Sequence, residues 1–344
     1  MAELHVVTGG SGYFGSLLVR KLREQGQAVR VFDLVDPDDR PPEVEFAQGD
    51  IRDLAAVRRA CEGATRVYHN VAQVPLAKDR HLFQSVNVQG TENLLSAAKD
   101  AGVRKVVYTS SSAVYGVPER NPVTEDMTPH PREAYGRAKL DGELACHRAA
   151  QQGLDVAIVR PRTILGHGRL GIFQVLFEWI RQGANVPVLG SGANQYQFVH
   201  ADDLAEACIL AGRRAGSATY NCGADRFGTM REVLEHLCAH AKTGSRVKRV
   251  PFWPAVVGMQ VTALVGISPL GPYHALMYGR SMYFDIGKAK AELGWQPRYS
   301  NNEMFVASYE WYLQHRDEVL RSHGASHHRS AVKQGVLALI PKLL

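Results

Sequence analysis

Between residues 4 and 161, short runs rich in β-branched and aromatic residues alternate with longer segments in which apolar residues recur every three or four positions. The short runs predict strands, and the longer segments predict amphipathic helices. The expected strands are Leu4–Thr8, Ala28–Asp33, Val44–Gln48, Arg66–Asn70, Arg104–Ser110 and Val156–Pro161. The expected helices are Gly15–Gln25, Leu54–Cys61, Asn87–Ala101 and Tyr135–Gln152. Such alternation predicts an α/β fold with a doubly wound parallel sheet.

The alternation weakens after residue 161. Helices are expected at 173–183, 230–241 and 300–316, whereas residues 197–210 have the pattern of a further strand and helix that return to the main sheet. The second region is therefore expected to be interleaved with the first. The expected parts are a nucleotide-binding domain at 1–165 with a return segment at about 197–212, a smaller substrate-binding region at 166–325, and a basic and apolar tail at 326–344.

The composition fits a globular protein with a large core. The chain has 344 residues, of which 45% are hydrophobic, enough for one large domain or two closely joined ones. The first expected strand has no apolar leader before it, which predicts a protein that stays in the cytoplasm. The five cysteines lack metal-binding or paired spacing, so we expect free thiols and no metal site.

The net charge of +6 is compatible with acidic partners. Basic residues are spread along the expected helices among acidic ones, so we expect no nucleic-acid partner. The exception is residues 329–344, where Lys333 and Lys342 stand among apolar residues. This tail could lie in a membrane surface but is too short to cross one, and a disordered or subunit-packing tail is the alternative.

A glycine pattern joins the first expected strand to the first helix. Gly9, Gly12 and Gly15 lie three residues apart, and Gly10 completes a G-x-G-x-x-G pattern with the last two. Glycines there allow a tight turn and close approach of a pyrophosphate, which the N-terminus of the following helix would hold. The pattern predicts a Rossmann-type dinucleotide site in which Tyr13 and Phe14 of the same turn also take part. An ordinary glycine-rich turn is the alternative.

Two acidic positions follow the next strands. Asp33 ends the second strand, where a carboxylate can accept hydrogen bonds from ribose hydroxyls and would repel a 2′-phosphate. NAD is therefore expected and NADP is disfavoured, although Arg30 and Arg40 lie near enough in sequence to keep NADP open. Asp50 and Ile51 follow the third strand and could flank the adenine, with a loop or helix cap as the alternative.

A tyrosine, a lysine and a serine could carry the chemistry. Tyr135 and Lys139 are four residues apart in an expected helix, so their side chains project from one face. The ammonium would lower the pKa of the phenol, which makes Tyr135 a candidate general base. The serines at 110–112 lie at the carboxyl end of a strand, where a hydroxyl could hold the substrate oxygen. A chance tyrosine-lysine spacing and a polar turn are the alternatives.

Together these segments resemble an extended short-chain dehydrogenase/reductase, in the group of NAD-dependent epimerases/dehydratases and 3β-hydroxysteroid dehydrogenases. The resemblance covers nearly the whole chain. It implies that Ser111, three residues before Val114, is the catalytic hydroxyl, and that Asn87 is the helix asparagine that supports the active site. A homodimer is usual in such enzymes. The matching segments are 8–15, Asp33, 49–50, 87–91, 110–115, Tyr135 with Lys139, 160–161, 198–203 and 285–297.

The resemblance also bears on the substrate. Dehydratases of this group carry an acidic pair where this chain has Ser112 and Ala113, which disfavours dehydration. Sugar-nucleotide epimerases usually place Asn and Arg, which bind the diphosphate, where this chain has Thr163 and Tyr196. The mostly uncharged stretch 251–274 could form an apolar pocket wall or lid, with core or dimer packing as the alternative.

These observations lead to a ranked set of functions. The first is an NAD-dependent enzyme that oxidises a secondary alcohol, or reduces the matching ketone, on a hydrophobic ring such as a steroid or sterol. Decarboxylation could accompany oxidation if a carboxylate lies beside the new ketone. The first alternative is a nucleotide-sugar 4-epimerase that uses bound NAD, and the second is a non-catalytic NAD-sensing protein.

Overall fold

The computed structural model describes residues 3–73, 80–168, 172–264, 277 and 279–321. Its centre is a seven-stranded parallel sheet with the strand order β11-β6-β5-β4-β1-β2-β3. The doubly wound α/β fold is thus confirmed. The strands are β1 (Leu4–Thr8), β2 (Ala28–Asp33), β3 (Glu45–Gln48), β4 (Arg66–His69), β5 (Lys105–Thr109), β6 (Val156–Pro161) and β11 (Ala218–Cys222).

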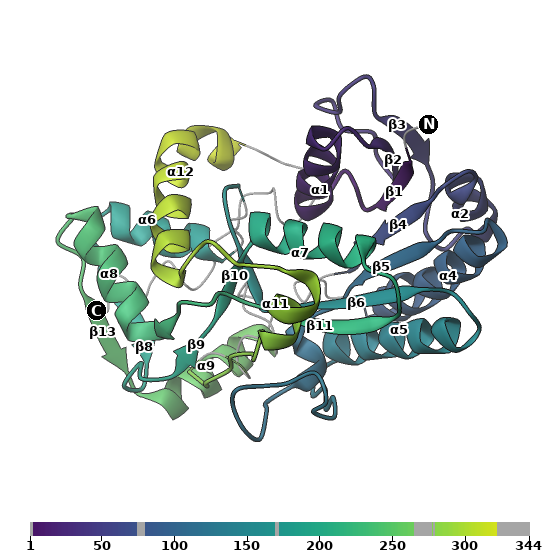
Figure 1. Cartoon of the computed structure of the whole chain (residues 1–344). Coiled ribbons are helices and arrows are strands. Elements are labelled where there is room, and N and C mark those ends of the chain that lie inside the picture. Colours follow the sequence, from purple (N-terminus) through teal and green to yellow (C-terminus); the bar gives the residue numbers. More distant parts are fainter. Residues whose placement is uncertain (1–2, 74–79, 169–171, 265–276, 278, 322–344) are drawn as a thin grey trace.

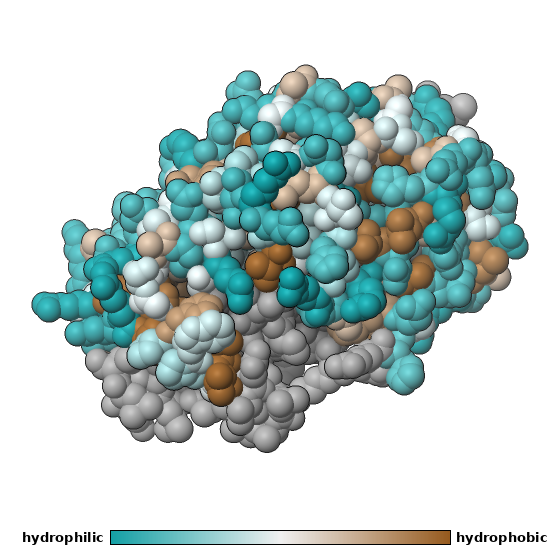
Figure 2. All heavy atoms as spheres, turned by 90° about the horizontal axis from the view of Figure 1, so that it is seen from below, coloured by the Kyte–Doolittle hydropathy of each residue, from teal (hydrophilic) through white to brown (hydrophobic). Residues whose placement is uncertain are grey.

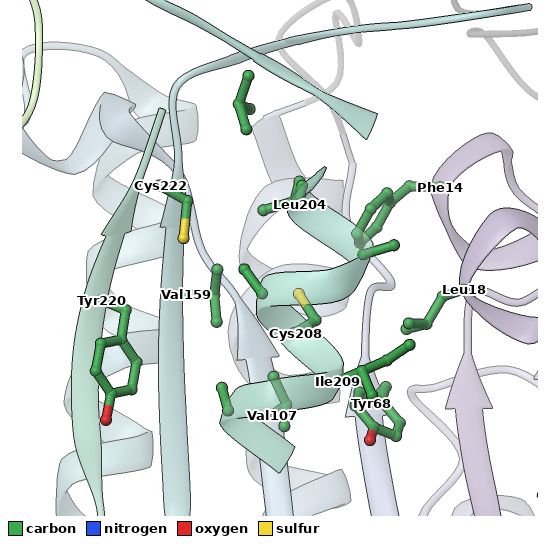
Figure 3. Close-up of a cluster of buried hydrophobic side chains, with 14 of the residues drawn as sticks. Phe14, Leu18, Tyr68, Val107, Val159, Leu204, Cys208, Ile209, Tyr220 and Cys222 are labelled. Carbon is green, nitrogen blue, oxygen red and sulfur yellow. The ribbon is translucent and has the colours of Figure 1, made fainter. Parts of the chain in front are cut away.

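Helices cover both faces of this sheet (Figure 1). One face carries α1 (Tyr13–Glu24) and α7 (Ala201–Arg213), and the other carries α2 (Leu54–Cys61), α4 (Gly90–Asp100) and α5 (Ala134–Gln151). Figure 3 shows Phe14 and Leu18 of α1 beside Leu204 and Cys208 of α7, over the strand residue Val107. Burial of such apolar faces supplies the main driving force for this layering.

The C-terminal region forms a second, smaller core. Phe177, Phe198, Phe305 and Tyr312 are buried in it. Its strands pair in twos, β7 with β10, β9 with β12 and β8 with β13. These elements are β7 (Thr163–Leu165), α6 (Phe173–Arg181), β8 (Val186–Leu189), β9 (Gln195–Tyr196), β10 (Phe198–His200), β12 (Gly228–Thr229), α8 (Met230–Ala241), β13 (Val247–Val250), α9 (Phe252–Leu264), α11 (Gly287–Leu293) and α12 (Asn301–Arg321).

The structure corrects the predicted return to the main sheet. The helix of the return segment, α7, does pack on that sheet. Its strand β10 instead pairs with β7, and the strand that joins the main sheet is β11, beside β6. The chain leaves the main sheet at Arg162, between β6 and β7. Strand β10 therefore lies in the two-stranded sheet that it forms with β7.

The predicted helix Asn87–Ala101 is also corrected. The helical segment starts earlier, with α3 (Arg80–Leu82) and the π-helix η1 (Phe83–Gln89), and α4 follows at Gly90. A Cβ on Gly90 would lie 2.6 Å from Ile51 Cγ2, so the junction sits tightly on the loop after β3. Wider π-type turns are frequent at functional sites, and here the π-helix contains Asn87.

All five cysteines are buried and free, as expected. Within the described ranges, no helix is long and apolar enough to cross a membrane. Figure 2, the view from below Figure 1, shows hydrophobic residues in small groups among hydrophilic ones. Of the stretch 251–274, residues 251–264 are described and contain all of α9, in which Trp253 is 68% exposed and Val256 is buried. The tail at 326–344 lies outside the described residues.

Candidate active site

The glycine turn has the geometry of a dinucleotide cradle. Gly9 has a φ of +70°, a left-handed conformation that favours glycine. A Cβ on Gly15 would lie 2.0 Å from the carbonyl oxygen of Gly9, so only glycine lets α1 start this close to β1. No described side chain caps α1 at Gly12, and its first turn holds no acidic residue. This helix N-terminus therefore suits a pyrophosphate.

Tyr13 and Phe14 open α1, two residues earlier than predicted, but their side chains point to different places. The Phe14 side chain is buried in the core beside α7 (Figure 3), so only its backbone is available to a cofactor. The Tyr13 side chain lies against the loop after β7. A Cβ added to Gly166 in that loop would be 2.9 Å from the Tyr13 hydroxyl. Tyr13 thus links the cradle to the C-terminal region.

Asp33 lies at the end of β2, beside the cradle. Its carboxylate accepts hydrogen bonds from the backbone N–H groups of Ser11 at 3.0 Å and Leu34 at 2.7 Å. The two arginines that left NADP open are both engaged elsewhere. Arg30 pairs with Glu45, and Arg40 donates to both carboxylate oxygens of Asp36. Neither is therefore held ready for a 2′-phosphate.

The predicted adenine-side residues lie on the loop after β3. The Asp50 carboxylate binds the Arg52 guanidinium, whose hydrogen bonds lower the pKa of this acid. The cap of α2 is Asp53, which accepts from the N–H of Ala55 at 2.9 Å. Ile51 is buried under the start of α4. The structure thus assigns the cap to Asp53, and the adenine contact stays a prediction.

Asn87 fastens the loop after β4. Its side-chain amide accepts from the N–H of Gln73 at 2.7 Å and donates to the carbonyl of the same residue at 3.1 Å. Next to it, the His69 ring bridges the hydroxyls of Thr8 at 2.7 Å and Thr91 at 3.0 Å. Complete burial lowers the pKa of His69 to about 3, so the ring is neutral and structural.

Helix α5, which carries Tyr135 and Lys139, and the serine segment are in direct contact. A Cβ on Gly136 would lie 2.4 Å from the carbonyl oxygen of Ala113, so α5 can approach the 3-10 helix η2 (Ser112–Tyr115) only with glycine at this position. Glu133 caps α5 by accepting from the N–H groups of Tyr135 at 2.7 Å and Gly136 at 2.6 Å. The start of α5, and Tyr135 with it, is thereby fixed beside the segment that follows Ser111.

The three predicted catalytic residues differ in how far their side chains are exposed to solvent. Ser111 and Tyr135 are half-buried, whereas Lys139 is 3% exposed. The Ser111 hydroxyl accepts from the N–H of Ala113 at 3.2 Å, and the Lys139 ammonium donates to the carbonyl of Thr109 at 2.8 Å. The hydroxyl and the phenol are thus partly accessible, while the cation is buried.

Burial lowers the pKa of Lys139 to about 8, and the nearby Glu143 opposes this shift. The ammonium also lies 4.9 Å from the centre of the Tyr108 ring, a cation–π contact. Tyr135 precedes Lys139 by four residues in α5, so the two side chains project from the same face of the helix. A partly accessible phenol on the same helix face as a buried cation is an arrangement suited to proton transfer at the phenol oxygen.

A buried network that was not predicted from the sequence surrounds Glu143. Its carboxylate accepts from Arg160 Nε at 2.9 Å and Nη2 at 2.6 Å, and from the Ser110 hydroxyl. Arg160 Nη1 donates to the Tyr115 hydroxyl at 2.6 Å, which in turn donates to the Asn221 side chain at 3.1 Å. Glu143 follows Lys139 by four residues, so their shared helix face could have indicated it.

We call this group the closed network: Ser110, Glu143, Arg160, Tyr115 and Asn221. It ties α5 to the ends of β5, β6 and β11 and to η2. A bidentate arginine–carboxylate pair is among the stronger polar contacts, and breaking a buried one is costly. The network therefore holds the helix of Tyr135 and the strand end of Ser111 in one arrangement.

Thr163 and Tyr196 stand where epimerases of the resembled group carry diphosphate-binding residues, and their side chains are in contact. The hydroxyls of Thr163 and Tyr196 lie 3.0 Å apart and share a hydrogen bond. Arg162 directly precedes Thr163. It is buried, and its Cζ atom stacks over the Tyr196 ring, 4.7 Å from the ring centre. Among the described residues, no group of three or more His, Cys, Asp or Glu side chains is placed to hold a metal ion.

Comparison with known proteins places this site in a family. The family model "NAD dependent epimerase/dehydratase family" matches residues 5–223. An uncharacterized protein of Sinorhizobium fredii, y4nG, is 56% identical over 98% of this chain and 86% of its own length. A 3beta-hydroxysteroid-dehydrogenase/decarboxylase of Arabidopsis thaliana is 31% identical over 85% of this chain and 59% of its own length.

Among solved structures, the UDP-glucose 4-epimerase of Thermus thermophilus in complex with NAD is 27% identical. The likeness covers 90% of this chain and 99% of that one, with a TM-score of 0.72. The cradle and the tyrosine-lysine helix lie inside the matched range of the family model. The chain belongs to the NAD-dependent epimerase/dehydratase family, and it is an NAD-dependent enzyme of the extended short-chain dehydrogenase/reductase type.

Proposed function

We propose that the chain oxidises a secondary alcohol on a hydrophobic ring, or reduces the matching ketone, in the manner of a 3β-hydroxysteroid or sterol dehydrogenase. NAD supplies the hydride acceptor, or as NADH the donor. The glycine turn, with Gly9, Gly12 and Gly15, would hold its pyrophosphate and Asp33 its adenosine ribose. The substrate is a small molecule in either direction of the reaction.

In this proposal three side chains act on the reacting oxygen. Tyr135 takes the hydroxyl proton as general base, and Ser111 donates a hydrogen bond that orients the oxygen. Lys139 keeps the phenolate favoured and reaches the cofactor ribose. The partial exposure of Ser111 and Tyr135 and the burial of Lys139 support these roles.

The observation that carries the choice of substrate is the pair Thr163–Tyr196. Two neutral hydroxyls that bind each other stand where nucleotide-sugar epimerases of this resemblance carry donors for a diphosphate. Loss of charge-assisted hydrogen bonds to phosphate costs about 1.5–3 kcal/mol each. The Arabidopsis relative, named as a 3beta-hydroxysteroid-dehydrogenase/decarboxylase, supports the same choice.

The product could also lose carbon dioxide. A carboxylate on the carbon beside the new ketone would make a β-keto acid, whose C–C bond electrons can move into the carbonyl as carbon dioxide leaves. The resulting enolate then takes a proton from water. No additional catalytic group is needed for this step, so we include it as an extension of the proposal.

A nucleotide-sugar 4-epimerase is the second candidate. The structural likeness to UDP-glucose 4-epimerases over nine-tenths of the chain favours it. Such an enzyme would oxidise and re-reduce the same sugar with no net formation of NADH. The two candidates therefore differ in a product that can be measured directly.

The test offers the purified protein NAD with a panel of 3β-hydroxysteroids and, separately, UDP- and dTDP-hexoses. We expect NADH absorbance to rise with a steroid and no sugar to be interconverted. Tyr135→Phe should reduce turnover by about 10²–10⁴-fold because it removes the general base. Tyr309→Phe removes a phenol hydroxyl in the C-terminal core and serves as the matched control. Epimerised sugar without steroid oxidation would overturn the proposal, and full activity of Tyr135→Phe would overturn the assignment of the base.

Three predictions from the sequence accompany this function. They are the division into a nucleotide-binding domain and a substrate-binding region, a homodimer, and a cytoplasmic location with peripheral membrane contact through the tail. The oligomer is testable by light scattering at two protein concentrations. Membrane contact is testable by co-sedimentation with vesicles of the full chain and of a chain ending at residue 325.

A further inference from the structure

Arg162, at the turn between β6 and β7, has an open guanidinium edge. The side chain is 1% exposed. Its Nη1 donates to the Ser112 hydroxyl at 2.8 Å and lies 3.2 Å from the sulfur of Met282. Its Nε and Nη2 atoms are buried and have no hydrogen-bond partner in the described part of the chain. Buried donors of a charged group without an acceptor are unfavourable, so this edge is suited to a ligand.

Two other arginines of the same chain show what such an edge binds. In Arg160, two residues earlier, Nε and Nη2 hold the two carboxylate oxygens of Glu143 at 2.9 and 2.6 Å. In Arg316, the same two atoms hold Glu178, both at 3.0 Å. The spacing of these donors matches the two oxygens of a carboxylate. Arg162 has the same edge without the acid.

Aromatic rings fix the plane of this guanidinium. The Arg162 Cζ atom lies 4.7 Å from the centre of the Tyr196 ring and 5.6 Å from that of Phe284. The Tyr196 hydroxyl is in turn bound to Thr163. Stacking stabilises the cation where it lies and limits its rotation toward another acceptor. The open edge is therefore a built feature of the site.

The position of Arg162 relates the edge to the reaction. Its partner Ser112 directly follows Ser111 and opens η2, which packs against α5 beside Tyr135. We propose that the Nε/Nη2 edge of Arg162 binds a carboxylate of the substrate, on a carbon close to the one that carries the reacting hydroxyl. This inference rests on the proposed function. Because both nitrogen atoms are buried, entry of the carboxylate requires a local shift of the surrounding side chains.

The test compares three substrates with NAD-loaded enzyme. They are a 3β-hydroxysteroid with a carboxyl group on the adjacent ring carbon, the methyl ester of that acid, and the unsubstituted alcohol. We expect the wild type to prefer the acid over the ester by about 100-fold in kcat/KM, the size typical of a buried charge pair. Arg162→Met should abolish this preference, so that the ratio of kcat/KM for the acid to kcat/KM for the ester falls to about one.

A second variant and a control complete the design. Arg162→Lys keeps the charge but loses the two-donor edge, so we expect part of the acid preference to remain. Arg226→Met removes an exposed guanidinium that pairs with Glu303 and should change nothing. NAD binding, measured by fluorescence, should be unchanged in all variants and reports that they fold.

The outcomes separate this inference from the proposed function. An acid preference that persists in Arg162→Met overturns the inference while steroid oxidation still supports the function. A nucleotide sugar could supply a phosphate with similar oxygen spacing, so calorimetry with UDP-glucose forms the second arm. UDP-glucose binding that requires Arg162 assigns the edge to a phosphate and overturns the carboxylate. If no ring alcohol is oxidised, the proposed function is wrong. In that case calorimetry still tests the inference: if Arg162→Met binds the steroid acid as tightly as the wild type does, the inference is overturned as well.

Discussion

Arg160 and Arg162 lie two residues apart, but the regions around them are built differently. Arg160 belongs to the closed network, in which the guanidinium and the Glu143 carboxylate are both bound by protein groups. Arg162 shares its surroundings with Thr163 and Tyr196 and keeps two buried donors unpaired among the described residues. The closed network is complete without a ligand, so it fixes in advance the groups that we propose to react. The region around Arg162 is incomplete, which is typical of a surface that recognises a substrate.

The difference suggests that the neighbouring regions around Arg160 and Arg162 have separate roles. The closed network joins α5, which carries Tyr135 and Lys139, to the strand end that carries Ser111. Preorganisation of this kind favours the transition state because little rearrangement remains during the reaction. The residues after Pro161 would then select the substrate. Three substitutions test how the closed network, the contact between α5 and η2, and the cofactor end of the sheet contribute to activity.

The largest effect is expected from Glu143→Gln, which breaks the closed network. Loss of one partner of a buried pair leaves the Arg160 charge uncompensated, and such losses cost about 3–5 kcal/mol of the free energy of unfolding. Chemical denaturation measures this cost. Glu92→Gln is the matched control, because the exposed pair Glu92–Arg148 should contribute less than about 1 kcal/mol.

The same variant should change the pH dependence of activity. Glu143 raises the pKa of Lys139 against the effect of burial, so its neutralisation lowers that pKa further below about 8. Lys139 then loses its charge at a lower pH, and the alkaline fall of kcat/KM should begin at a lower pH than in the wild type. An unchanged alkaline limb, together with unchanged stability, would contradict the role given to the closed network.

A smaller effect is expected from Gly136→Ala, which separates α5 from η2. The new Cβ would lie 2.4 Å from the carbonyl oxygen of Ala113, a backbone atom that cannot move alone. Overpacking of this kind costs about 1–3 kcal/mol, and turnover should fall because Tyr135 moves relative to Ser111. Gly258→Ala in α9 is the control, since a Cβ there meets nothing within 4 Å. Equal turnover in the two variants would show that this close contact does not position the reacting groups.

The smallest effect is expected from Asp33→Ala, at the cofactor end of the sheet. Loss of the ribose acceptor and of the bond to the Ser11 N–H should weaken NAD binding by about tenfold, or about 1.4 kcal/mol. NADP binding should change less, because the carboxylate also repels its phosphate. Titration of both cofactors measures the ratio, with Asp53→Ala as a control that affects only the cap of α2. A fall in affinity for NADP as large as that for NAD would remove Asp33 from cofactor choice.

Periodicity predicted the parts of this molecule that depend on local pattern. The strands β1, β2 and β6 and the helices α2 and α8 have the bounds expected from the sequence. The cradle was also predictable, because its glycines act within one turn of chain.

Features that depend on distant contacts escaped prediction. Strand β11 has no clear apolar alternation, and its place beside β6 is set by pairing in three dimensions. The π-helix is a change of hydrogen-bond register that leaves the apolar pattern intact. The sequence does not distinguish Glu143 from other acidic residues in helices, because its pairing with Arg160 forms only in the fold. Arg162 likewise becomes a candidate binding residue only because no acid pairs with its Nε and Nη2 in the described structure.

Net oxidation of a ring alcohol can be followed with one isotope. The steroid of the panel is prepared with deuterium on the carbon that carries the hydroxyl, and the enzyme is given excess NAD. We expect ketone and deuterated NADH to accumulate in equal amounts, as measured by mass spectrometry. Absence of NADH, together with a UDP-hexose that changes configuration and retains a deuterium placed on its own carbinol carbon, would contradict this expectation.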